Sequence, residues 1–103
     1  MMSRDYNGLS GSVNVVSVGN SPIMIYGGSP YTCTLLIGAP TANRITISND
    51  PNVSDGKGIV IAALQPPLEL TADKYGLFLG LPIYAIANTG TNTFGVLAIV
   101  EGS

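Results

Sequence analysis

The distribution of glycine and proline limits what this chain can fold into more than any other feature. Thirteen glycines and seven prolines are spread so evenly that few windows longer than ten residues lack one. Both residues weaken helices, and Val, Ile, Thr and Tyr dominate the segments between them. The pattern therefore predicts short strands separated by turns, with no helix.

Short alternating or apolar segments mark the expected strands. In the clearest one, residues 44–48, Ile45 and Ile47 are expected to face inward and Thr46 outward. The others are expected at residues 12–18, 23–26, 31–38, 59–64, 68–71, 83–87 and 93–100. A turn is expected at residues 73–76, before a strand-like segment at 77–81, and residues 88–91 predict a hairpin that joins the strands on either side.

Eight or nine short strands at this spacing predict an all-β fold, a single β-sandwich or jelly-roll-like domain. The length of 103 residues is that of one domain. The first ten residues are polar and contain glycine, so we expect a flexible N-terminal arm at residues 1–10 and the sandwich at residues 11–103.

The chain carries very little charge. Only 10% of its residues are Asp, Glu, Lys or Arg, against roughly a quarter in ordinary domains, and none lies between Asp5 and Arg44 or between Lys74 and Glu101. Because a free monomer needs a charged surface, we expect much of this surface to contact neighbours in an assembly. The four basic residues are too scattered to neutralise adjacent phosphates, so nucleic-acid binding is not expected.

The sequence also argues against catalysis and cofactor binding. It has no histidine, the commonest general base and metal ligand, so we expect no enzyme, no metal and no cofactor. The single cysteine, Cys33, cannot form an internal disulfide and is expected to be a small buried side chain. The longest apolar run, residues 75–87, contains two glycines and a proline and is shorter than a membrane helix of about 20 residues. With no secretory signal at the N-terminus, we expect synthesis in the cytoplasm and no membrane span.

One polar loop, residues 49–58 (NDPNVSDGKG), could hold a cation. Asp50, Asn52 and Asp55 resemble the oxygen ligands of a calcium loop, but the third ligand comes one position late. Turn chemistry is the preferred interpretation, because Asp-Pro opens turns and the Asp-Gly and Lys-Gly pairs tolerate positive φ. A calcium site is the alternative.

The candidate partner-binding residues are aromatic or lie in the arm. Tyrosine combines a large apolar body with a polar tip, which suits protein interfaces and also sugar recognition. Tyr26 and Tyr31 flank a Gly-Gly-Ser-Pro turn, and Tyr6 and Arg4 lie in the expected arm. We expect these four residues to contact a partner.

Four runs in the second half carry a resemblance to a known class of proteins: ITISNDPNVSDGKGIVI (45–61), PPLELT (66–71), LPIYAIANTGT (81–91) and VLAIVE (96–101). Across residues 43–101 the pattern resembles small β-rich virion proteins of tailed bacteriophages. The resemblance implies a capsid decoration, or cement, protein on the exterior of the phage head. Such a protein is expected to be a homotrimer that binds over junctions of the major capsid protein, here through residues 1–20 and one face of the sandwich.

A second function remains open at this point. The tyrosines and the polar loop also suit a head or tail fibre module that binds a host-surface glycan or receptor. The absence of tryptophan, the preferred sugar-stacking residue, weakens that alternative.

Overall fold

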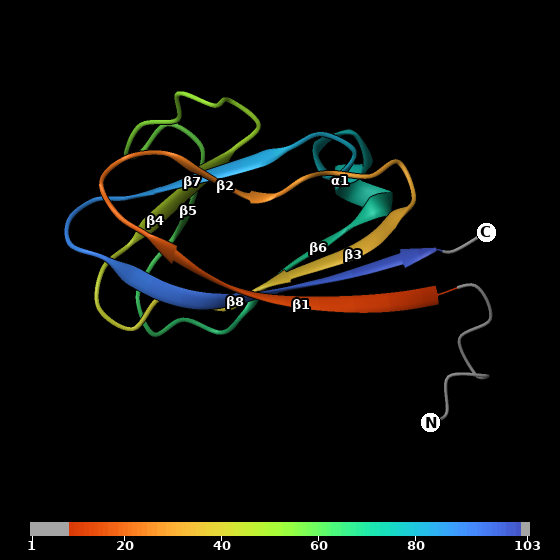
Figure 1. Ribbon diagram of the computed structural model, residues 1–103, viewed down its shortest axis with the longest axis horizontal. Helices are drawn as coiled ribbons and strands as arrows, with labels where there is room; N and C mark the ends of the chain where they lie inside the picture. Colours follow the sequence, from red (N-terminus) through yellow and green to blue (C-terminus); the bar gives the residue numbers. More distant parts are fainter. Residues whose placement is uncertain (1–8, 102–103) are drawn as a thin grey trace.

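The chain folds as a β-sandwich of eight strands and one short helix. The computed structural model describes residues 9–101. In chain order its elements are β1 (Leu9–Val18), β2 (Ile23–Tyr26), β3 (Thr32–Ile37), β4 (Ile45–Ser48), β5 (Ile59–Ile61), β6 (Leu68–Thr71), α1 (Ala72–Leu79), β7 (Ile83–Ala87) and β8 (Asn92–Glu101). The strands form two antiparallel four-stranded sheets, one above the other in Figure 1. This architecture confirms the all-β sandwich expected from the sequence.

The order of the strands is that of a jelly roll. Sheet A has the order β1-β8-β3-β6 and sheet B the order β2-β7-β4-β5. The first strand therefore pairs with the last, the second with the seventh, the third with the sixth and the fourth with the fifth. This nested pairing arises when one long antiparallel hairpin folds so that its strands alternate between two sheets. A sandwich with this strand order is a jelly roll.

The core lies between the two sheets and follows the alternation of the strands. In β7, for example, Ile83, Ala85 and Ala87 are buried while the residues between them are half-buried. The buried core consists of Val18, Ile25, Leu35, Ile37, Ile45, Ile47, Ile61, Leu70, Leu79, Ile83, Ala85, Ala87, Phe94, Val96 and Ala98. All of these side chains are apolar, so the sandwich is held together mainly by hydrophobic burial.

The prediction of a hairpin at residues 88–91 is wrong. Strands β7 and β8 lie in different sheets, and the turn between them crosses from sheet B to sheet A, with Gly90 at φ +65°. At the end of the crossing, the Asn92 side-chain oxygen accepts the backbone N–H of Asn43 at 3.2 Å. Strand β8 has ten residues and β7 only five, so a hairpin would leave half of β8 unpaired, whereas β1 pairs with all ten.

The expectation of no helix is also wrong, because α1 replaces the turn and strand expected at residues 73–81. Local sequence supports this helix poorly: Tyr75 departs from helical geometry, and Thr71 makes no side-chain cap. Tertiary contacts support it instead. Leu79 is fully buried in the core, and the Asn49 side chain donates to the carbonyl oxygens of Phe78 (3.1 Å) and Pro82 (2.9 Å). The bond to Phe78 satisfies a carbonyl at the end of α1 that has no partner within the helix, so a distant residue stabilises this helix end.

Two smaller differences concern β1 and β3. Strand β1 begins at Leu9, so paired backbone extends two residues into the range expected for the arm. Cys33 is half-buried rather than buried, because a register shift between Thr32 and Thr34 displaces it from the inward-facing series.

Candidate interaction surface

Of the two expected tyrosines within the described residues, Tyr26 has a structural role. Its ring is half-buried and packs against the core, and its hydroxyl shares a hydrogen bond with the Thr32 hydroxyl. That bond ties the end of β2 to the start of β3 across the intervening turn. Arg4 and Tyr6, the candidates in the arm, lie outside the described residues.

Tyr31 is the exposed member of the expected set, with 62% of its surface accessible. Its backbone is held firmly although its ring is free. The Tyr31 carbonyl accepts the N–H of Glu101 at 2.8 Å, and its own N–H donates to the Ser29 hydroxyl at 3.1 Å. An exposed aromatic ring on a fixed backbone costs little entropy when a partner covers it.

The turn that carries Tyr31 is packed against the end of α1. The Ser29 N–H donates to the Leu79 carbonyl at 3.1 Å, and Gly28, at φ +82°, lies against the backbone of Leu81. Because a side chain on Gly28 would overlap the Leu81 carbonyl group, this close approach requires glycine. The contacts place residues 28–31 and 79–81 at the same end of the sandwich.

Four large apolar side chains are exposed at this end: Tyr31, Tyr75, Leu77 and Leu81. We call these four residues the helix-end surface. Leu77 is the most exposed, at 82%. Sequence reasoning missed the three that belong to or follow α1, because it placed a turn and a strand there. Their only sequence signal is the absence of charge between Lys74 and Glu101.

The 49–58 loop folds back onto sheet B instead of extending into solvent. Val53 is buried, and the N–H of Gly56 donates to the Thr46 hydroxyl at 3.0 Å. Thr46, expected to face outward, is therefore fully buried. It does point away from the core formed by its neighbours Ile45 and Ile47, but the loop covers it.

A bidentate ion pair fastens the same loop to the start of β4. Arg44 donates from Nε to Asp55 Oδ1 at 3.0 Å and from Nη2 to Oδ2 at 2.5 Å. These hydrogen bonds lower the pKa of the Asp55 carboxyl and raise the pKa of the Arg44 guanidinium, because each partner favours the charged form of the other. Both side chains are partly exposed, so solvent screens the pair.

The loop geometry agrees with the turn interpretation. Both Asp55 oxygens accept bonds from Arg44, and Asp50 Oδ1 accepts the N–H of Asn52 at 2.9 Å in an Asx turn. Gly56 has φ +82°, as an Asp-Gly turn requires. Within residues 9–101, no three acidic, cysteine or histidine side chains gather into a possible metal site.

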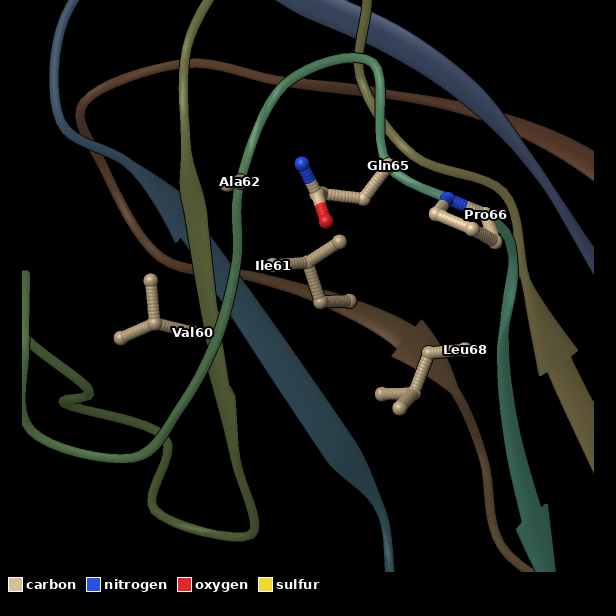
Figure 2. Close-up of a pocket in the computed structure, with 6 residues that line it drawn as sticks. All are labelled: Val60, Ile61, Ala62, Gln65, Pro66 and Leu68. Atoms are coloured by element: carbon tan, nitrogen blue, oxygen red, sulfur yellow. The ribbon is translucent and has the colours of Figure 1, made fainter.

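A shallow apolar groove lies where the edges of the two sheets meet. It has a volume of about 290 Å³ and is lined by Val60, Ile61, Ala62, Gln65, Pro66 and Leu68. Figure 2 shows the Gln65 amide extending from the β5–β6 connection toward Ile61. Five apolar side chains and one amide supply no acid, base or nucleophile, so the groove can receive an apolar side chain but offers no group for catalysis.

Comparisons with known proteins identify a shared fold and no family. No family model matches the chain, and no curated protein matches it. Among solved structures, a chain from a study described as "Bacillus endospore appendages form a novel family of disulfide-linked pili" is similar, with a TM-score of 0.51. The match covers 92% of this chain and 88% of that chain at 12% sequence identity. At that identity the likeness shows the sandwich fold alone.

No helix within residues 9–101 is long and apolar enough to cross a membrane.

Proposed function

We propose that this protein is a structural virion component, a capsid decoration protein that binds over junctions of the major capsid protein on the phage head. The observation that carries the proposal is the helix-end surface, where Tyr31, Tyr75, Leu77 and Leu81 are exposed on a packed scaffold. Exposed large apolar side chains at one end of a folded domain are a common feature of protein interaction sites.

Low charge supports the same proposal. A contact at this surface buries apolar area, and few charges have to lose their hydration because none lies between Lys74 and Glu101. Each contact is small and therefore weak by itself. On a shell with many equivalent positions, binding through several linked copies adds stability that no single contact provides.

The proposal keeps the expected assembly: a homotrimer on the outer surface of the head, in contact with the major capsid protein and with neither nucleic acid nor membrane. A closed cyclic trimer gives three copies of the helix-end surface in fixed relation. The solved neighbour is described as forming pili, so the same fold serves there in a many-copy assembly. We extend only that structural role to this chain.

Co-sedimentation with capsids stripped of minor proteins tests the proposal. The wild-type protein should saturate at a fixed number of copies per major capsid subunit, and decorated shells should withstand higher temperatures. The variant Leu77→Ser should reduce the affinity about tenfold, as expected when a well-placed apolar side chain is lost from an interface. Met24→Ser, at an exposed position on β2 outside the groove and the helix-end surface, is the matched control and should bind like the wild type.

Failure of the wild-type protein to bind any shell would overturn the decoration proposal. The fibre module would then take first place, because the exposed ring of Tyr31 also suits stacking on a sugar. A glycan array probed with wild-type protein and Tyr31→Ala would test that alternative.

A further inference from the structure

The four edge strands of the sandwich differ sharply in how they are protected. Three are short: β2 has four residues and a register shift, β5 has three, and β6 has four, with Glu69 among them and two prolines just before. Shortness, bulges, charge and proline are the usual devices that prevent an edge from pairing with another chain. Strand β1 has none of them.

Strand β1 is an unprotected edge along ten residues. It pairs with β8 in continuous register from Leu9 to Val18 and contains no charged residue and no proline. Within residues 9–101, β8 is its only strand partner, and Figure 1 shows β1 along the border of sheet A. Every second residue of an antiparallel strand directs its N–H and C=O away from the neighbour it is paired with, so about half of the β1 backbone groups face outward.

We propose that β1 pairs antiparallel with β1 of a second copy of this chain, so that two sheets A join into one continuous sheet. Length argues for this partner. The other edges have three or four residues, so within this fold only another β1 can match the full ladder. Charge argues for it as well, because two uncharged strands meet without repulsion.

Symmetry restricts the register of this pairing. An antiparallel pair of identical strands is related by a two-fold axis perpendicular to the sheet, which keeps both cores on the same face. Directly opposed residues then lie on the same face of the joined sheet. Because the faces alternate along a strand, the two opposed residues are both even-numbered or both odd-numbered, and their numbers add up to an even value. The two longest such registers place either Asn14 or Val13 opposite its own copy, with nine residues of each strand paired.

This inference does not rest on the proposed function. It describes a contact between two copies, which is compatible with a trimer formed through other surfaces. On a shell, two-fold links through β1 would connect neighbouring trimers. In free solution the same contact makes the protein associate with itself in a concentration-dependent way.

Sedimentation velocity of wild-type protein and Val15→Lys tests the pairing. Val15 is 73% exposed, so lysine there leaves the core intact. In the register centred on Asn14, the two lysines would lie diagonally opposite each other across the new ladder. Self-association should weaken roughly tenfold or more, whereas Met24→Lys, at an exposed position on β2, should associate like the wild type.

Disulfide trapping identifies the register. In a Cys33→Ser background, Asn14→Cys or Val13→Cys should form a linked dimer on mild oxidation, because opposed Cα atoms about 4.5–5.5 Å apart suit a disulfide. Ser17→Cys is the control on the same strand. In the Asn14 register it lies six positions from its own copy, about 20 Å along the strand, and should not cross-link.

The proposal is overturned if the wild-type protein stays monomeric, if Val15→Lys associates as strongly as the wild type, or if Ser17→Cys cross-links as fast as Asn14→Cys and Val13→Cys. A monomeric wild type whose shell binding is abolished by Val15→Lys would assign the β1 edge to a strand of the capsid protein instead. Because self-association is measured without shells, its failure is distinct from a failure of the decoration proposal.

Discussion

Arg44 and Asp55 form a two-point ion pair that closes the 49–58 loop over the outer face of sheet B, with donor–acceptor distances of 3.0 and 2.5 Å. Beneath it, the buried Thr46 accepts the N–H of Gly56. The loop is therefore a covering layer of the sandwich, and its contacts lead to testable consequences for stability.

The first prediction concerns acid. The pKa of Asp55 is lower in the folded protein than in the unfolded chain, mainly because of its hydrogen bonds to Arg44. The unfolded state therefore takes up the proton first as the pH falls. The stabilisation is fully present above the ordinary Asp value of about 4, and it is lost as the pH falls through the lower folded value.

Melting temperatures measured against pH would show this effect. Asp55→Asn should melt below the wild type at pH 7, and the difference should shrink below about pH 4 as the wild-type carboxylate becomes protonated. Glu101→Gln, which removes one charge from β8, is the control. A difference between wild type and Asp55→Asn that stays constant down to about pH 2 would contradict this account.

The second prediction isolates the hydrogen bond beneath the loop. Thr46→Val keeps the shape of the side chain but leaves the N–H of Gly56 without its acceptor, which should cost about 1–2 kcal/mol of unfolding free energy in urea. Ser17→Ala removes an exposed hydroxyl that is bonded to Thr93 and should change stability by less than about 0.5 kcal/mol. Equal losses in the two variants would contradict the buried role of Thr46.

The third prediction compares three glycines that differ in backbone conformation and in the space around them. Gly28→Ala combines a positive φ with a clash against the Leu81 backbone, where the new Cβ would lie 2.5 Å from the carbonyl carbon, and should destabilise by more than about 2 kcal/mol. Gly56→Ala has the positive φ alone, with open space around it, and should cost about 1 kcal/mol. Gly27→Ala has neither and should be close to neutral or slightly stabilising. Chemical denaturation would rank the three, and a loss for Gly28→Ala no larger than that for Gly56→Ala would disprove the packing of this turn on residues 79–81.

The fourth prediction concerns Leu64, which is 79% exposed and has a left-handed backbone, φ +61°. Its N–H donates to the Pro40 carbonyl at 2.9 Å, which holds this geometry in place. Leu64→Asn should raise the unfolding free energy by up to about 1 kcal/mol, since asparagine tolerates this conformation, and Leu64→Val should lower it by about 1 kcal/mol. Thermal melts that rank valine above asparagine would show that residue 64 relaxes out of this conformation.

Much of the fold can be predicted from the local pattern. Alternation and turn residues are enough to predict the fold class and the positions of most strands, and β2, β6 and β7 occupy the expected residues. The same holds for the Asp-Gly turn of the 49–58 loop, since Gly56 has the positive φ that this pair predicts. These features depend on residues close together in the sequence, whose propensities and alternation can be read directly.

The other features of the fold depend on contacts between residues far apart in the chain. Whether β8 pairs with β7 or with β1 depends on which partner satisfies all ten of its residues, and that information lies more than seventy residues away in the chain. Helix α1 depends on burial of Leu79 and on the distant amide of Asn49, and Thr46 is buried only because the loop returns over it. The helix-end surface and the open β1 edge follow from these long-range contacts, because a side chain or a strand edge is left exposed only after every other element has taken its partner.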